Sequence, residues 1–180
     1  MIRLSRRRLE AFLPQVCEIE EETDFLVFDA ASGADAKVTT FMRSADQVLL
    51  VATPDPASIV DVYATAKVLF RNRPDAFVQI VVNMVEDEHQ AQRVFAAVQS
   101  ATNKFIGGAV YYGGFVRLDR RAAQLARQRQ VFVEVAPDLP ASRDIRAIAA
   151  RLNAISPQSS SETGVKRLRS AFSPVRRKAA

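Results

Sequence analysis

A single carboxylate closes the first apolar run of the chain, at a position where chemistry could take place. Asp29 follows FLVF (25–28) and is itself followed by the small residues AASG. In α/β proteins, ligands bind in the crevice outside the carboxyl ends of parallel strands. A carboxylate there can hold a Mg²⁺ ion directly or through water, as nucleotide-hydrolysing proteins require. The alternative is that Asp29 only caps the next turn, a common role for an aspartate after a strand.

The composition excludes several other chemistries within these 180 residues. His89 is the only histidine, so neither a histidine-based metal cluster nor a Ser-His-Asp triad is available. Cys17 is the only cysteine, which excludes an internal disulfide and fits a reducing compartment. The sequence contains no run of about 18 apolar residues, which is the length that a helix needs to span a bilayer. We therefore expect a cytoplasmic protein without most of the hydrolase chemistries.

Short apolar runs alternate with helical patterns along the chain. Continuous apolar runs are typical of strands covered on both faces, and they occur at 25–28, 48–53, 78–83, 109–116 and 131–135. Apolar residues at helical spacing predict helices at 3–20, 55–70, 86–105, 119–128 and 140–154. This order predicts an α/β fold with a mostly parallel sheet flanked by helices. The adjacent glycines Gly113 and Gly114 indicate a close approach of the backbone to another element.

The net charge of +5 is concentrated toward the end of the chain. From Pro157 onward there are six basic residues and one acid, which leaves 19 basic and 19 acidic residues in the rest. A basic tail on a neutral domain indicates an anionic partner surface, either membrane or nucleic acid. The sequence SPQSSSETG lacks apolar residues and is typical of a flexible linker. We expect an α/β domain at 1–155, a linker at 156–164 and a basic segment at 165–180.

The basic segment has the pattern of a short amphipathic helix. Apolar residues recur at three- and four-residue spacing while basic residues fill the positions between them, which suits a lipid interface. The expected membrane-binding residues are Val165, Lys166, Arg167, Leu168, Arg169 and Phe172. A solvated tail is the alternative. A third interpretation is that the segment binds nucleic acid, but it has no aromatic residues arranged for base stacking to support this.

The ends of the apolar runs, taken in order, resemble those of a known family. They read DAASG (29–33), VATPDP (51–56), VVNMVED (81–87) and VAPDLPAS (135–142). Together they resemble the MinD/ParA family of deviant-Walker P-loop ATPases, and in particular its FlhG branch, which counts and places flagella. The resemblance covers roughly residues 9–153, and TPDPASIVDVYATAKVL followed by VVNMV is its most specific part. Each motif alone is weak evidence for this resemblance, whereas the ordered set is strong evidence.

The resemblance implies a role for several residues in a site for ATP and Mg²⁺. The aspartate that opens the D-x-x-x-G turn, here Asp29, would hold the Mg²⁺ shell indirectly, and Gly33 would let the turn follow the γ-phosphate. Asp35 lies on the same switch segment. Asn83 would hydrogen-bond the adenine edge, to which a side-chain amide offers both a donor and an acceptor; the alternative is a turn residue at the end of a strand. Pro137 and Asp138 would line the base.

The sequence also departs from the family pattern. Ala31 stands where the turn usually has a glycine, which removes a freely rotating residue from the switch. None of the six glycines precedes a lysine in the glycine-rich GKGGxGK pattern that wraps the phosphates. In the family, the phosphate-loop strand lies between the strand before Asp29 and the strand at 48–53. We therefore expect a truncated domain of the family, whose two neighbouring strands either pair directly or bind a partner chain, including a second copy.

These departures leave two interpretations of function open. One is a MinD/FlhG-like nucleotide switch for placing flagella or division sites, deficient in ATP hydrolysis as these residues stand, because phosphoryl transfer depends on charge stabilisation. MinD-like proteins end in a segment similar to VKRLRSAF, which implies a peripheral position at the inner face of the membrane. The other is a non-catalytic interaction protein, or a fragment of a longer ParA-like ATPase, with DNA association as a further option.

Overall fold

The computed structural model describes residues 14–16, 18–20, 22–30, 36–155, 164 and 166–168. The chain divides into two compact units. The first consists of Met1–Asp46 and Ser159–Ala180, and the second consists of Gln47–Gln158.

The second unit is built on a parallel sheet. Its three described strands, β1 (Val48–Ala52), β2 (Val78–Val85) and β3 (Val110–Arg117), lie in the order β1-β2-β3. Both pairs are parallel, with Val48 opposite Val78 and Val78 opposite Val110. The predicted α/β class and the parallel pairing are therefore confirmed.

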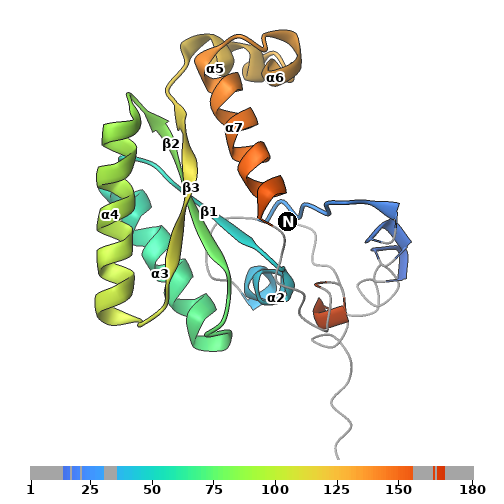
Figure 1. Ribbon diagram of the computed structural model, residues 1–180, viewed down its shortest axis with the longest axis vertical. Coiled ribbons are helices and arrows are strands. Elements are labelled where there is room, and N and C mark those ends of the chain that lie inside the picture. Colours follow the sequence, from blue (N-terminus) through green and yellow to red (C-terminus); the bar gives the residue numbers. More distant parts are fainter. Residues whose placement is uncertain are drawn as a thin grey trace, which may run out of the picture. The chain divides into compact units, whose positions relative to one another are not determined.

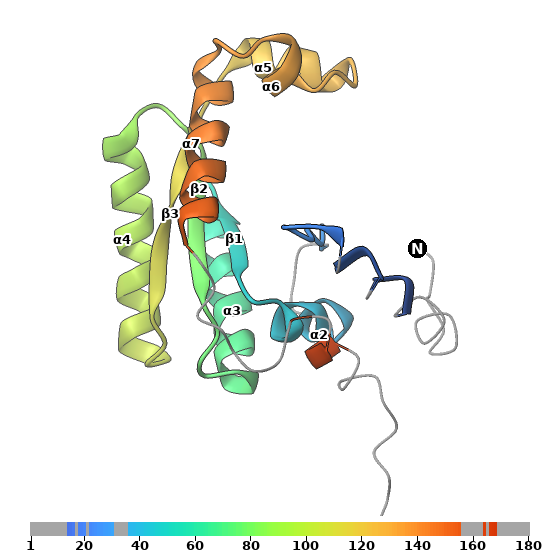
Figure 2. The ribbon, with the colours of Figure 1, turned by 45° about the vertical axis from the view of Figure 1, so that its right-hand side comes forward.

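Helices cover both faces of this sheet. Figure 1 shows α3 and α4 together on one side of the strands and α7 on the other. Both views place α5, α6 and the start of α7 beyond the ends at which β2 and β3 finish (Figure 1; Figure 2). The helices are α3 (Pro56–Asn72), α4 (Glu88–Phe105), α5 (Arg120–Arg127), α6 (Phe132–Val135) and α7 (Pro140–Ala154).

Strand β2 is buried on both faces because it lies in the middle of the sheet. This explains its continuous apolar run, since a strand covered on both faces has no solvent side for polar residues. The helices add the small and branched residues that pack on it. The apolar side chains of β2, α3 and α4 with 0% exposure are Val78, Ile80, Val82 and Val85 of β2, Ala66 and Leu69 of α3, and Ala91 and Val98 of α4.

Aspartate side chains begin three of the helices. Asp55 accepts a hydrogen bond from the backbone N–H of Ala57 (2.9 Å), and Asp87 accepts one from Gln90 (2.7 Å). Asp119 likewise caps α5. Such caps satisfy backbone donors that have no partner inside the helix. The four predicted helices from 55 onward are confirmed, each to within about two residues at its ends.

Two predicted strands are wrong. FLVF (25–28) has no regular secondary structure, and Val27 is 85% exposed. A strand is held by hydrogen bonds to a neighbour, and no described strand pairs with this segment. VFVEV (131–135) contains helix α6 instead, because α7 binds its carbonyl groups: Ser142 donates to the carbonyls of Phe132 (3.3 Å) and Ala136 (2.7 Å).

The first unit contains helix α2 (Ala36–Ser44). Residues 14–16, 18–20 and 22 are also helical, in agreement with the helix predicted near the start of the chain. The ring of Phe28 contacts that of Phe41 on α2, with centroids 5.4 Å apart. Because of this contact, Phe28, the last residue of FLVF, is only 38% exposed.

Candidate functional site

Asn83 lies at the carboxyl end of β2, where the sequence places it. Its Oδ1 accepts a hydrogen bond from the backbone N–H of Met84 (2.9 Å). Met84 has a left-handed backbone (φ 60°), and the pairing with β3 shifts at this point, so the strand bulges. A non-glycine residue in this conformation costs roughly 1–2 kcal/mol, and such strain and bulges are frequent at ligand sites. The half-buried amide can therefore offer a ligand its N–H donors and the second lone pair of Oδ1.

Pro137 and Asp138 lie in the connection between α6 and α7. Pro137 is half-buried, and the side chain of Asp138 is 94% exposed with a long ion pair to Arg143 (3.7 Å). The connection is held in place by Ser142, whose hydroxyl donates to the carbonyl of Ala136. Since α6 and the start of α7 lie beyond the carboxyl ends of the strands, these residues and Asn83 are at the same end of the second unit (Figure 1).

The predicted magnesium-side residues belong to another part of the chain. Asp29 is exposed and lies in the first unit, where no described strand precedes it. Gly33 and Asp35 lie outside the described residues. Within the described part of the chain there is no group of three or more His, Cys, Asp or Glu residues that could hold a metal ion. The amide of Asn83 is therefore available to a ligand, while the roles of Asp29, Gly33 and Asp35 stay predictions.

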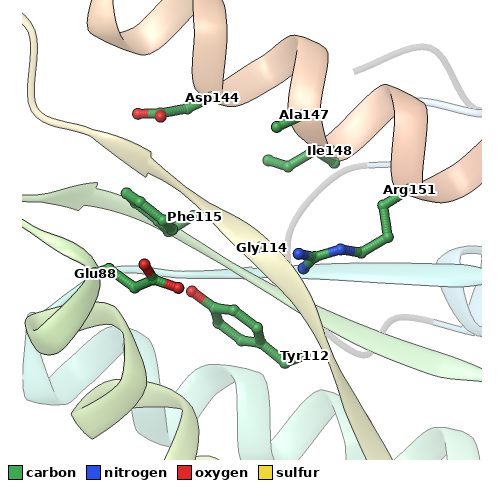
Figure 3. Close-up of a pocket in the computed structure, with 8 residues that line it drawn as sticks. All are labelled: Glu88, Tyr112, Gly114, Phe115, Asp144, Ala147, Ile148 and Arg151. Atoms are coloured by element: carbon green, nitrogen blue, oxygen red, sulfur yellow. The ribbon is translucent and has the colours of Figure 1, made fainter.

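A pocket beside β3 is the feature that sequence reasoning missed. It is a cavity of about 60 Å³ whose polar and aromatic lining is Glu88, Tyr112, Phe115, Asp144 and Arg151, with Gly114 at its wall. Figure 3 shows the Glu88 carboxylate and the Tyr112 hydroxyl pointing toward one another, with the Arg151 guanidinium reaching toward them from α7. We call it the Tyr112 pocket. The adjacent glycines at 113 and 114 were the sequence signal for it.

Those glycines do mark a close approach. A Cβ on Gly114 would lie 2.8 Å from Cγ1 of Ile148 on α7, and one on Gly113 would lie 3.1 Å from Cγ2 of Val81. Gly114 also has φ +126°, which side chains rarely adopt. The register between β2 and β3 shifts here, with Ile80 opposite Tyr112 and Val81 opposite Gly114. The predicted close approach is confirmed, and it lets α7 lie against the strand beside the pocket.

An ion pair fixes α7 to the carboxyl end of β3. Asp144, 8% exposed, accepts hydrogen bonds from the backbone N–H and Nε of Arg117 (2.9 Å each) and from its Nη2 (2.7 Å). The hydrogen bond from Arg117 to Asp144 raises the pKa of the guanidinium. Because α7 begins just after Pro137 and Asp138, this pair also positions the connection that carries them.

The tail residues fall partly within the described structure. Lys166, Arg167 and Leu168 are helical, with Lys166 exposed and Leu168 only 2% exposed. Arg167 donates from Nε to the carbonyl of Ser44 (3.1 Å) and forms an ion pair with Asp46. Val165, Arg169 and Phe172 lie outside the described residues. In the described part of the chain, no helix has the length and apolar character needed to cross a bilayer.

Comparison with known proteins finds similarity to an antiactivator and to a flagellum site-determining protein. No protein-family model matches the chain. It is 28% identical over 153 residues to the antiactivator FleN of Pseudomonas aeruginosa, covering 85% of this chain and 55% of FleN. It is also 28% identical over 130 residues to the flagellum site-determining protein YlxH of Helicobacter pylori, covering 72% of this chain and 44% of YlxH. The resemblance to the MinD/ParA family and its FlhG branch is confirmed.

Solved structures agree on the fold. The MinD cell division protein of Aquifex aeolicus superposes with a TM-score of 0.63 at 17% identity, covering 85% of this chain and 62% of that one. A chain of the MinC:MinD cell division protein complex of the same organism gives 0.62 at 20% identity, covering 84% and 62%. The chain spans about half the length of the curated relatives that it matches.

Proposed function

We propose that this chain is a FlhG-like regulator of spatial placement that contributes the base side of a nucleotide site. The observation that carries the proposal is the match to FleN and YlxH, which for FleN covers 85% of the chain. FleN is an antiactivator and YlxH is a flagellum site-determining protein, so the number or position of flagella is the expected output.

Deletion of the gene tests the cellular role. We expect cells without it to show altered flagellar number or position by electron microscopy, with normal spacing of division septa. A deletion that misplaces septa and leaves flagella unchanged would contradict the flagellar output and favour a role in division. Normal flagella and normal septa would contradict the placement role altogether.

We assign the base side of the nucleotide site to Asn83, with Pro137 and Asp138 at the same end of the second unit. The half-buried amide at the end of β2 supports this role, because its N–H donors have no hydrogen-bond partner among the described residues. We expect Asn83→Ala to weaken binding of a fluorescent ADP analogue roughly three- to tenfold, since one hydrogen bond contributes about 0.5–1.5 kcal/mol. Asn103→Ala is the matched control, because Asn103 is exposed in the last turn of α4, at the opposite end of the sheet. Equal affinity in both variants would remove the role of Asn83.

ATP hydrolysis is not expected of these 180 residues alone. They contain no lysine-bearing glycine loop to stabilise the γ-phosphate, and phosphoryl transfer depends on such stabilisation. Asp29 is retained as the candidate for the Mg²⁺ side, with Gly33 and Asp35 on the same segment. Steady turnover of ATP by the purified chain, abolished by Asp29→Ala, would contradict this part of the proposal.

The tail is proposed to bind anionic membranes. Basic residues near an anionic surface contribute about 1 kcal/mol each, and an apolar face adds to this. Leu168 must first leave its buried position, which costs about 1.5–3 kcal/mol for a leucine. Binding by a single tail is therefore weak, and two tails in a dimer would bind more firmly.

Vesicle sedimentation separates an interfacial helix from a simple basic patch. We expect Phe172→Asp to reduce binding to anionic vesicles at any salt concentration, because it disrupts the apolar face and leaves every basic residue in place. Changing Arg176 and Arg177 to Ser should reduce binding chiefly at low salt. Binding that survives Phe172→Asp and disappears in the arginine variant would show a basic patch only, for which duplex DNA becomes the better partner.

A second candidate function is interaction without catalysis, favoured by the uncovered edge of the sheet. Strand β1 lies at an edge of the described sheet, and Leu49 and Val51 are 40% and 56% exposed. An edge strand presents unpaired N–H and C=O groups to which another strand can add. A second copy of the chain is the first partner to test, and we expect Val51→Lys to lower self-association in sedimentation equilibrium. A wild-type chain that stays monomeric would contradict the second copy as partner.

A further inference from the structure

The Tyr112 pocket contains a buried hydroxyl that the described residues leave without a partner. Tyr112 Oη is shielded from solvent and makes no hydrogen bond with any described residue. Its ring is held from two sides, by Phe95 of α4 (5.2 Å between centroids) and by Arg151 of α7, whose guanidinium lies 5.7 Å from the ring centre. The ring is therefore fixed while its hydroxyl faces the cavity.

The hydroxyl is a hydrogen-bond donor at neutral pH. Burial raises the pKa of Tyr112, and the nearby Glu88 carboxylate raises it further, while Arg151 acts in the opposite direction. A buried donor without a partner costs about 1–3 kcal/mol. A ligand that accepts a hydrogen bond at this point thus recovers free energy that the empty pocket lacks.

The other polar groups define what the ligand must offer. Arg151 supplies further donors and Glu88 supplies an acceptor, and both residues are exposed at the mouth of the cavity. Asp144 also lines the cavity, but its oxygens accept hydrogen bonds from Arg117. The ion pair with Arg117, which lies outside the lining, balances the charge of Asp144, and the remaining charged groups of the lining, Glu88 and Arg151, carry opposite charges. A charged ligand would meet a like charge, whereas a neutral group with one acceptor and one donor would not.

We propose that the Tyr112 pocket binds a neutral carboxamide group. Its oxygen accepts hydrogen bonds from the Tyr112 hydroxyl and the Arg151 guanidinium, and its N–H donates to the Glu88 carboxylate. The cavity of about 60 Å³ has room for a few water-sized groups, at roughly 10–15 Å³ each, which suits an amide group. The amide comes either from an Asn or Gln side chain or from a main-chain peptide bond.

The backbone of β3 supports a built site. The bulge at Gly113 and the close packing of Gly114 on Ile148 bring α7 against the strand, so that Arg151 reaches the ring of Tyr112. Bulges commonly redirect side chains beside binding sites. None of these residues takes part in the proposed nucleotide site, so the proposal is independent of that function.

Titration of the ¹⁵N-labelled full chain with small probes, followed by NMR, tests the proposal. The probes are acetamide, which mimics the side-chain source, N-methylacetamide, which mimics the main-chain source, and the charged controls acetate and methylammonium. We expect one of the two amides to shift the Gly114 amide resonance saturably, with at least fivefold higher affinity than either charged probe. The stronger of the two amides identifies the source.

Variants make the result specific to the hydroxyl. We expect Tyr112→Phe to weaken amide binding at least fivefold and the matched control Tyr111→Phe to leave it unchanged, because Tyr111 is 49% exposed and stacks on Phe77. Arg151→Met, at an exposed position, should also weaken amide binding, and this variant tests the proposal if Tyr112→Phe fails to fold. Three results would each overturn the proposal. They are tighter binding of acetate or methylammonium, amide binding that is unchanged in both Tyr112→Phe and Arg151→Met, and the absence of a saturable shift with either amide. The last result would mean that the pocket holds water only.

Discussion

The ion pair between Arg117 and Asp144 allows a stability prediction that can be worked from the structure. Asp144→Ala removes the acceptor of three hydrogen bonds, one of them from the backbone N–H of Arg117. Breaking a buried ion pair costs about 3–5 kcal/mol. The Arg117 side chain is 40% exposed, so water can solvate its guanidinium after the change, which lowers the cost. We expect a loss of about 2–3 kcal/mol in the free energy of unfolding.

Urea unfolding and thermal unfolding, both followed by circular dichroism, measure this loss. A change of 1 kcal/mol shifts the melting temperature of a chain of this size by about 2–4 °C, so Tm should fall by roughly 4–12 °C. The matched control is Asp75→Ala. Asp75 is 83% exposed and lies 3.8 Å from Arg73, and exposed pairs contribute only about 0–1 kcal/mol.

A double-mutant cycle isolates the pair from other effects of the substitution. Arg117→Ala combined with Asp144→Ala should cost less than the sum of the two single changes, because the second change removes a group that has already lost its partner. A loss below about 1 kcal/mol for Asp144→Ala, or an equal loss for Asp75→Ala, would refute the reasoning. In either case α7 would be held against β3 by apolar packing alone.

Three further predictions concern the pocket and the start of α4. Glu88→Gln should lower the pKa of Tyr112 and Arg151→Met should raise it, measured by ultraviolet titration against Tyr112→Phe; shifts in the same direction would contradict the assigned charges. Since the pKa of Tyr112 is raised in the folded state, stability should fall as the pH rises above about 10, and Tyr112→Phe should reduce that fall. Asp87→Ala should cost about 1 kcal/mol through loss of the helix cap, measured by urea unfolding, and an unchanged midpoint would show that the cap is dispensable.

The elements predicted from local chemistry agree with the structure. Apolar residues at helical spacing predict α3, α4 and α5 because the buried face of each helix is encoded within the segment itself, and an aspartate caps the start of each. The strands at 48–53, 78–83 and 109–116 were predictable for the same reason. Their continuous apolar runs match burial by helices on both faces.

The two wrong strands show where local chemistry is insufficient. FLVF (25–28) is as apolar as β1, and VFVEV (131–135) has only one charged residue, yet neither pairs with a described strand. Pairing depends on a neighbour that the segment itself does not encode. In VFVEV the deciding groups are Ser142 and Arg146 of α7, whose side chains bind carbonyls of the segment from about ten residues away.

The two candidate sites also differ in how far the sequence could predict them. The position of Asn83 was predictable because this polar residue ends the apolar run of a buried strand, and the carboxyl ends of parallel strands gather at one edge. The Tyr112 pocket was not, because Glu88, Tyr112 and Arg151 come from three elements, and each alone is an ordinary residue at a helix start, on an edge strand or on a helix surface. What makes Tyr112 a candidate is a missing hydrogen bond, and whether a hydroxyl has a partner is settled only when α4, β3 and α7 are in place. The two glycines that follow it are the part of this arrangement that a sequence can show, since they permit the approach of α7.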